Sequence, residues 1–279
     1  MAADETTRAE VLADVLGRYE GMDDARLHEI VTSAIRHLHA FVADVGLTHD
    51  EWMEGIEFLT AVGQMCDDVR QEFILLSDTL GVSTLVEHID YDAAAGATEN
   101  TVLGPFYLAD PPRRAFGEST LENPDDGERV VVRGRVTGVD GSPIAGATVD
   151  VWQNATSGFY SVQQPGVQHP YNLRGVYETR DDGTYEFRAV RPMPYPIPGD
   201  GPVGRLMAAC GRDIMRPGHI HVMASAPGYK TLITHVFDAA TEHLEDDAVF
   251  GVRPSLIRTF QPDGEDELAT TFDIVLSPQ

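Results

Sequence analysis

Residues 130–138, VVVRGRVTG, and residues 148–154, TVDVWQN, decide the fold class of this chain. Both stretches are short and rich in β-branched residues, which fit the pleated, half-buried surface of a strand. The dipeptide Asp140-Gly141 lies between them, and glycine allows the backbone conformations that tight turns need. The two stretches therefore predict two β-strands joined by a turn.

Five more stretches of the same kind follow toward the C-terminus. They are VYETR at 176–180, TYEFRAV at 184–190, HIHVMAS at 219–225, TLITHVF at 231–237 and TTFDIVL at 270–276. Turn dipeptides such as Asp182-Gly183 and Gly199-Asp200 punctuate this part of the chain. Short strands at turn-separated intervals indicate a β-sandwich, and no parallel βαβ alternation is visible.

The first hundred residues have a helical pattern instead. Between Arg26 and Val45 the apolar residues recur at the spacing of one helix face. They are Leu27, Ile30, Val31, Ala34, Ile35, Leu38 and Phe41. This stripe is equally consistent with packing against the sandwich and with an additional buried face.

Three more helices are predicted before residue 100. Thr48 and Glu51 form a candidate capping box for a helix that runs to about Cys66. A second helix is predicted from Asp67 to Leu80, ending at Gly81, and a short one from 83 to 88. The chain is thus predicted to be mainly β, with an α-helical N-terminal region over 1–100 and a β-sandwich domain over 101–279.

Bulk properties limit the partners and the cellular compartment. The chain has 20 Lys and Arg against 45 Asp and Glu, a net charge of −25, which disfavours nucleic acid and anionic membrane as partners. Solubility is the simplest reason for this acidity. Cys66 and Cys210 show no metal-like or disulfide spacing. The N-terminus lacks the pattern of a secretory signal, and no apolar stretch approaches the ~20 residues that span a bilayer, so a cytoplasmic protein is expected.

Four residues in the β-rich half are candidate metal ligands: Tyr160, Tyr195, His219 and His221. His219 and His221 are two apart in a predicted strand, which places both imidazoles on one face. Tyrosine is an uncommon ligand because its phenol titrates near pH ~10, but a highly charged cation stabilises the phenolate. Two phenolates and two neutral imidazoles suit ferric iron better than zinc.

Each of these residues alone would be weak support for a metal site. A single tyrosine in a β-rich protein is usually a packing residue. A second His-x-His pair, His37 and His39, lies on a predicted helix, where the two rings would be about 200° apart around the axis. That pair is expected to be on the surface.

Longer segments around the four candidates resemble the intradiol ring-cleavage dioxygenases. The segments are GRVTGVDGSPIAGATVDVWQNATSGFY (134–160), NLRGVYETRDDGTYEF (172–187), YPIPGDGPVG (195–204) and RPGHIHV (216–222). TVLGPFYL (101–108) is similar to the substrate-pocket segment of that family. The resemblance runs from about Glu51 to the C-terminus. It is closest to the hydroxyquinol 1,2-dioxygenases, through VLGPFY (102–107), FYSVQQPG (159–166), APGYKTLITHVFD (226–238) and DDAVFGV (246–252).

This resemblance implies one non-haem Fe(III) per subunit, bound by Tyr160, Tyr195, His219 and His221. It also implies that Tyr195 is the ligand that detaches and accepts a substrate proton. Arg216 would stabilise negative charge on the activated ring, the alternative being a surface ion pair. The N-terminal helices would pair two subunits into a homodimer, in which lipid is often bound.

The resemblance also implies a substrate pocket. Its predicted wall consists of Leu75, Asp78, Val102, Leu103, Gly104, Pro105, Phe106, Ile197, Pro198 and Val249. Leu75 and Asp78 are i and i+3 on a predicted helix and share a face, and Asp78 would accept a hydrogen bond from the third hydroxyl of a trihydroxybenzene. Catechol-cleaving relatives typically carry Gln where this chain has His235, which is expected not to bind the metal.

The implied reaction is cleavage of hydroxyquinol (1,2,4-trihydroxybenzene) with O₂ to 3-hydroxy-cis,cis-muconate, the tautomer of maleylacetate. One alternative is a catechol or chlorocatechol 1,2-dioxygenase that yields cis,cis-muconates. A distant alternative is a non-catalytic binding module, because residues 133–152 also resemble the opening strands of prealbumin-like domains.

Overall fold

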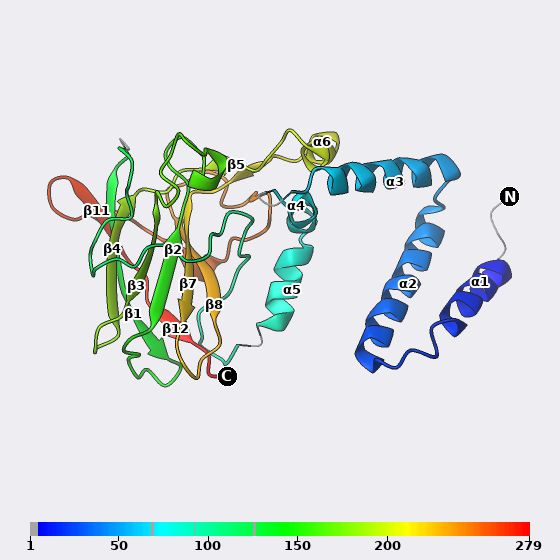
Figure 1. Cartoon of the computed structure of the whole chain (residues 1–279), viewed down its shortest axis with the longest axis horizontal. Coiled ribbons are helices and arrows are strands. Elements are labelled where there is room, and N and C mark those ends of the chain that lie inside the picture. Colours follow the sequence, from blue (N-terminus) through cyan, green and yellow to red (C-terminus); the bar gives the residue numbers. More distant parts are fainter. Residues whose placement is uncertain (1–4, 68–69, 92, 125–126) are drawn as a thin grey trace. The chain divides into compact units, whose positions relative to one another are not determined.

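A computed structural model describes residues 5–67, 70–91, 93–124 and 127–279 of the chain. These residues divide into two compact units, Met1–Ala61 and Val62–Gln279 (Figure 1). The domain boundary predicted at residue 100 stays a prediction.

The first unit is helical. It contains α1 (Glu5–Gly17), α2 (Ala25–Val45) and most of α3 (His49–Gln64). Asp24 caps α2 by accepting hydrogen bonds from the backbone N–H groups of its first turn, and Gly46 ends it in the left-handed conformation, φ 61°. The predicted capping box of α3 is confirmed, because Thr48 N donates to Glu51 Oε2 at 2.9 Å and Glu51 N donates to Thr48 Oγ1 at 3.3 Å.

Three further helices lie in the second unit: α4 (Glu72–Thr79), α5 (Val82–Asp90) and α6 (Pro202–Ala209). The helix predicted from residue 67 begins at Glu72, and residues 68 and 69 lie outside the described part of the chain. Helix α6 was not predicted, since its sequence belongs to a proline- and glycine-rich run. Pro202 occupies its first turn, where a missing N–H costs no helical hydrogen bond.

The rest of this unit is the predicted sandwich of two five-stranded sheets. One sheet has the order β10–β11–β1–β12, with β4 paired to β1, and the other has the order β3–β2–β7–β8–β9. The longer strands are β1 (Arg129–Gly138), β2 (Thr148–Trp152), β3 (Arg174–Glu178), β4 (Thr184–Val190), β7 (His219–Ser225), β8 (Leu232–Asp238) and β11 (Glu267–Thr271). The shorter ones are β9 (Ile257–Arg258), β10 (Gln261–Pro262) and β12 (Ile274–Leu276), and β5 (Tyr195–Pro196) pairs with β6 (Met215–Arg216) apart from both sheets.

The strand predicted over 270–276 is wrong as a single element. It is divided between β11 and β12, which pair in parallel with successive parts of β1. At the break, Phe272 N donates to Arg133 O, and a Cβ on Gly134 would lie 2.0 Å from Phe272 O. The chain bends here because glycine lets the two backbones approach closely.

Strand alternation separates the core from the candidate site. Val149 and Val151 of β2 and Ile220 and Val222 of β7 point into the buried core between the sheets. The residues between them point to the opposite face of the same sheet. There the register places Trp152 opposite both Arg174 and His221, and His221 opposite His235. These four side chains form one row across β3, β2, β7 and β8.

A buried carboxylate connects α4 to α6. Glu72 Oε2 accepts hydrogen bonds from Arg70 at 2.8 and 3.0 Å, while Oε1 accepts one from Val203 N in the first turn of α6 at 3.1 Å. The same arginine also pairs with the exposed Asp200 at 2.9 Å. Glu72 therefore stabilises the N-terminus of α6 and places α4 against it.

Replacing Glu72 with alanine is expected to lower the free energy of unfolding by about 3 kcal/mol, because it removes the buried partner of an ion pair and a helix cap. Asp200→Ala removes the exposed partner of the same Arg70 and should cost less than about 1 kcal/mol. Urea unfolding of the two variants measures the difference. Equal losses would contradict the role given to Glu72.

Candidate metal centre

The structure brings the four predicted ligands together. Tyr160 precedes a short 3₁₀ turn, Tyr195 lies on β5, and His219 and His221 lie on β7. The Tyr160 hydroxyl is 3.3 Å from the Tyr195 hydroxyl and 3.1 Å from His221 Nε2, and the Nε2 atoms of His219 and His221 are 3.2 Å apart. All four side chains are buried.

These separations fit one metal ion. With metal–nitrogen and metal–oxygen bonds of about 2.0–2.1 Å, neighbouring donor atoms of a tetrahedral centre lie roughly 3.3 Å apart. The three measured separations lie between 3.1 and 3.3 Å. Two phenol oxygens and two imidazole nitrogens favour a hard, highly charged cation over zinc.

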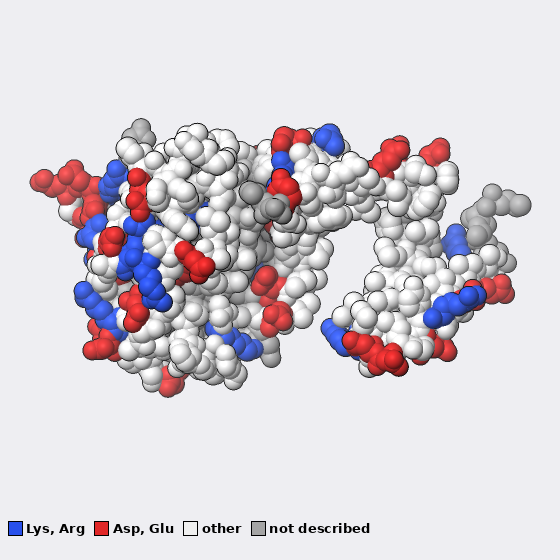
Figure 2. Space-filling model, viewed as in Figure 1, with Lys and Arg blue, Asp and Glu red and all other residues white. Residues whose placement is uncertain are grey.

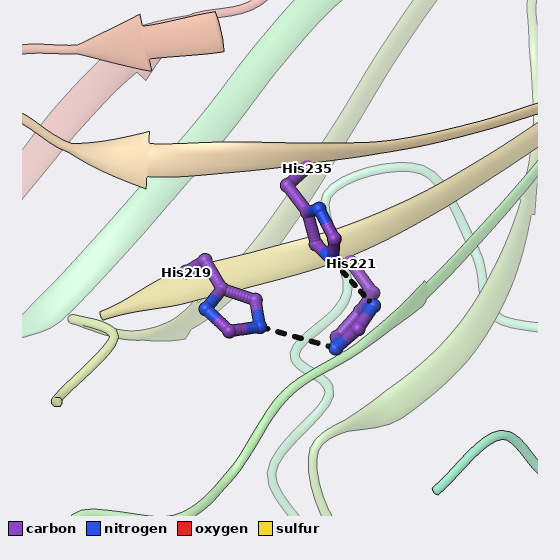
Figure 3. Close-up of side chains that lie close together, drawn as sticks. All are labelled: His219, His221 and His235. Carbon is purple, nitrogen blue, oxygen red and sulfur yellow. Dashed lines mark hydrogen bonds between the residues drawn. The ribbon is translucent and has the colours of Figure 1, made fainter. Parts of the chain in front are cut away.

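The other ring nitrogens support the same conclusion. His219 Nδ1 lies 2.7 Å from the carbonyl oxygen of Pro217. His221 Nδ1 lies 2.8 Å from His235 Nε2, as Figure 3 shows. When each Nδ1 carries the proton, both Nε2 atoms present lone pairs to each other. Two lone pairs at 3.2 Å repel, and a cation between them turns this repulsion into attraction.

Burial sets the protonation states of the donors. It lowers the pKa of His219 and of His221 well below the usual value, and nearby Arg216 acts in the same direction. Both imidazoles are therefore neutral, as metal binding requires. Burial also raises the pKa of Tyr160 well above its usual value, and its neighbour Tyr195 adds to this effect. A bound cation would provide the charge that stabilises the phenolate.

A third buried histidine, His235 of β8, lies within 4.8 Å of this pair by its ring nitrogens. It contacts Nδ1 of His221, while Nε2 of His221 faces His219 and Tyr160. Figure 3 shows His219 and His235 next to different nitrogens of the His221 ring. His235 is thus positioned beside the donor set, and its predicted exclusion from metal binding stays a prediction.

Arg216 is buried next to the tyrosine hydroxyls and does not form a surface ion pair. Its Nη1 donates to Tyr195 Oη at 3.2 Å and its Nε donates to Asp247 Oδ1 at 3.1 Å. Burial is the largest single effect and disfavours the cation, but Asp247, Tyr195 and Tyr160 together outweigh it and raise the guanidinium pKa, so Arg216 stays protonated. Its buried Nη2 has no hydrogen-bond partner among the described residues. A buried N–H without a partner favours a bound anion.

A pocket of about 450 Å³ lies beside this centre, within the usual range for small-molecule sites. It is lined by five of the predicted wall residues, Leu75, Pro105, Phe106, Ile197 and Pro198. Sequence reasoning did not find Arg70, Phe159 or Ile214, which also line it. They contribute to the wall through contacts between distant segments, which have no local signal.

The other five predicted wall residues are not among the residues that line this pocket. Leu103 packs against Trp152 and the two tyrosines, and a Cβ on Gly104, φ 75°, would lie 3.2 Å from His221 Cε1. Val249 N donates to Asp247 Oδ1 at 3.3 Å, next to Arg216. Asp78 and Val102 are both 3% exposed.

Arginine side chains on the sandwich surface are balanced by carboxylates. In Figure 2 basic and acidic groups are interspersed over this unit. Arg133 pairs with Asp263 and lies 3.8 Å from Glu186, while Arg188 lies 3.4 Å from Glu186 and 3.5 Å from Glu267.

Among the described residues, no helix combines the length and apolar character needed to cross a membrane.

Comparison with known proteins places this centre in a family. The "Catechol dioxygenase N terminus" model matches residues 24–98, and the "Dioxygenase" model matches residues 102–278. A hydroxyquinol 1,2-dioxygenase of Rhizobium sp. (strain MTP-10005) is 50% identical over 88% of this chain and 83% of that protein. A 6-chlorohydroxyquinol 1,2-dioxygenase of Cupriavidus pinatubonensis is 48% identical over 95% of each.

A solved structure agrees with these sequence matches. The hydroxyquinol 1,2-dioxygenase of Pseudomonas putida DLL-E4 superposes with a TM-score of 0.92 and is 42% identical, covering 99% of this chain and 100% of that one. The predicted fold class, a β-sandwich with an α-helical N-terminal region, is confirmed. The chain therefore belongs to the intradiol ring-cleavage dioxygenases, and it is an enzyme of that family.

Proposed function

We propose that this protein is a non-haem Fe(III) enzyme that cleaves hydroxyquinol with O₂ between its adjacent hydroxyl-bearing carbons. The product would be 3-hydroxy-cis,cis-muconate, the tautomer of maleylacetate. The observation that carries the proposal is the convergence of the Tyr160, Tyr195, His219 and His221 donor atoms within 3.1–3.3 Å of their neighbours. Similarity to two hydroxyquinol 1,2-dioxygenases and to a 6-chlorohydroxyquinol 1,2-dioxygenase supports the substrate.

Tyr160, Tyr195, His219 and His221 would hold one iron per subunit. When bound, ferric iron would draw electron density from a coordinated diol and make its ring reactive toward O₂. The Tyr195 phenolate would take a proton from the diol on its Oη, and the hydrogen bond from Arg216 Nη1 at 3.2 Å would keep that oxygen beside the donor set. The apolar side chains of Leu75, Phe106 and Ile197 would exclude water from the ring.

Arg216 would stabilise the negative charge that develops on the substrate. Its charge is fixed and its burial reduces dielectric screening, so its effect on a neighbouring anion is strong. Asp247 holds the guanidinium through Nε and leaves Nη2 without a protein partner among the described residues. This Nη2 group could donate a hydrogen bond to the bound substrate, which supports a direct contact between Arg216 and the substrate.

Asp78 would recognise the third hydroxyl. It shares a face of α4 with the pocket residue Leu75, and it is near enough to Arg216 and Asp247 for both charges to affect its pKa. Burial raises that pKa, while Ser83 and Arg216 oppose the shift. A buried carboxyl of this kind gains from a hydroxyl donor that restores part of its lost solvation.

Asp78→Ala is expected to reduce kcat/KM for hydroxyquinol by about 10–100-fold, the value of a hydrogen bond to a charged group, with a loss of less than about 3-fold on catechol. Leu75→Ala is the matched control on the same helix face and should weaken both substrates alike. Steady-state oxygen uptake measures all four values. Equal losses on both substrates in Asp78→Ala would remove Asp78 as the specificity residue.

Oxygen uptake with hydroxyquinol, catechol and 4-chlorocatechol tests the proposed substrate. The highest kcat/KM is expected for hydroxyquinol. Preference for catechol or 4-chlorocatechol would establish the alternative 1,2-dioxygenase function with the same iron chemistry. A prealbumin-like binding module explains only residues 133–152, whereas the family models match 24–98 and 102–278.

We further propose a homodimer formed through the N-terminal helices, with lipid bound there. Large apolar side chains of α2 are exposed, among them Leu27, Ile30, Leu38 and Phe41. A hollow of about 880 Å³ between α1 and α2 is lined mainly by apolar residues, including Leu12, Val42 and Leu47. Both features favour burial by another apolar group. Native mass spectrometry would measure the subunit number and any retained lipid.

A further inference from the structure

His221 is held from two sides by its cross-strand neighbours. On one side the Trp152 ring stacks on it, with centroids 4.7 Å apart and an interplanar angle of 11°. On the other side His235 lies with its ring centroid at 4.2 Å and a tilt of 62°. Trp152 and His235 are the residues directly opposite His221 on β2 and β8. The sheet register therefore sets the place of this imidazole.

The hydrogen bond to His235 sets the tautomer of His221. His221 Nε2 lies 3.1 Å from Tyr160 Oη and 3.2 Å from His219 Nε2, whereas Nδ1 lies 2.8 Å from His235 Nε2. A neutral imidazole has one N–H and one lone pair. If Nε2 provides the lone pair to a metal, Nδ1 must carry the proton and donate a hydrogen bond to His235 Nε2.

We propose that His235 is a positioning residue for the metal centre: it accepts a hydrogen bond from the Nδ1–H group of His221 and so presents His221 Nε2 to the iron. The inference rests on the proposed function. It assigns His235 to a role outside the ligand set, although its ring nitrogens lie as close to the other histidines as a third ligand would.

Thr101 occupies the other ring nitrogen of His235. Its Oγ1 is hydrogen-bonded to His235 Nδ1. When His235 Nε2 accepts from His221, Nδ1 of the neutral ring carries the proton and donates to Thr101 Oγ1. Thr101 N donates to Ile233 O at 2.8 Å, and Thr234 Oγ1 donates to Glu99 O at 2.7 Å. The segment from 99 to 101 is thus fixed along β8, and both nitrogens of His235 are occupied within the protein.

The test compares the rate at which purified, iron-loaded protein loses iron to a ferric chelator. His235→Leu removes the acceptor and should lose iron about 10–100-fold faster, as is typical for outer partners of metal ligands. His235→Gln keeps an acceptor oxygen and should stay within about 3-fold of wild type by the same reasoning. Val236→Ala is the control. It opens a cavity on the core face of the same strand, so it should lower the melting temperature and leave iron release unchanged.

Thr101→Val is a second variant for the same measurement, and it keeps every histidine and tryptophan ring. It should accelerate iron release, as His235→Leu does. It takes the place of His235→Leu if that variant does not accumulate as folded protein. The visible absorption band of the loaded protein should shift in both variants and stay unchanged in Val236→Ala.

Three results would overturn the inference while the proposed function stands. They are iron release at the wild-type rate in His235→Leu and Thr101→Val, equally fast release in Val236→Ala, and release from His235→Gln as fast as from His235→Leu. The last result would make the imidazole itself a ligand. Wild-type protein that contains no iron and consumes no oxygen would overturn the proposed function, and this inference with it.

Discussion

Tyr160→Phe should lose iron and almost all hydroxyquinol turnover. The change removes one of two anionic donors while keeping the ring, which packs against Phe106 at a centroid distance of 4.7 Å. Because Tyr160 Oη lies between Tyr195 Oη and His221 Nε2, no neighbouring oxygen replaces it. The loss of metal affinity and of activity should exceed the roughly 10–100-fold loss that follows removal of a hydrogen-bond partner of a metal ligand.

Tyr185→Phe is the matched control for this variant. Tyr185 is equally buried, and its hydroxyl donates to Phe272 O at 2.6 Å in the core. Its removal should cost about 1 kcal/mol of stability and leave iron content and kcat/KM unchanged. Metal analysis and oxygen uptake of both variants decide the result. Full iron content in Tyr160→Phe would contradict its assignment as a ligand.

Arg216→Met is expected to lower kcat by about 10²–10³-fold while iron stays bound, the usual cost of removing one donor that stabilises developing charge. The change also leaves Asp247 buried without its partner, which should reduce stability by about 3–5 kcal/mol. Arg216→Lys should restore little activity, because an ammonium cannot reach both Asp247 and Tyr195 as the guanidinium does.

The double variant Arg216→Met with Asp247→Asn separates the two effects. It removes the uncompensated charge, so part of the stability should return while kcat stays low. Urea unfolding and single-turnover kinetics measure the two quantities. Recovery of both stability and kcat in the double variant would show that Arg216 acts only through folding.

The sandwich could be predicted from the sequence because each strand carries its own alternating pattern. The same pattern placed His219 and His221 on one face of β7, and the structure shows both side chains there. The division of 270–276 into β11 and β12 could not be predicted, since it depends on contact between Gly134 and Phe272, which are far apart in the chain. Helix α6 was missed because its proline and glycine residues are typical of loops.

Less of the candidate site than of the fold could be predicted from the sequence. Spacing alone did not connect Tyr160 with Tyr195, 35 residues apart, and only the family resemblance brought them together. The partners of the functional groups had no local signal at all. Asp247 reaches Arg216 across 31 residues, and Thr101 reaches His235 across 134. Such contacts follow from strand register and loop packing, which one sequence does not reveal.

Metal analysis with a visible spectrum of the natively isolated, chelator-free protein tests the central claim most directly. One iron atom per chain and a red-brown colour from phenolate-to-iron charge transfer are expected, and the band should shift when catechol is added without oxygen. A colourless protein without iron would contradict a ferric centre built from Tyr160, Tyr195, His219 and His221.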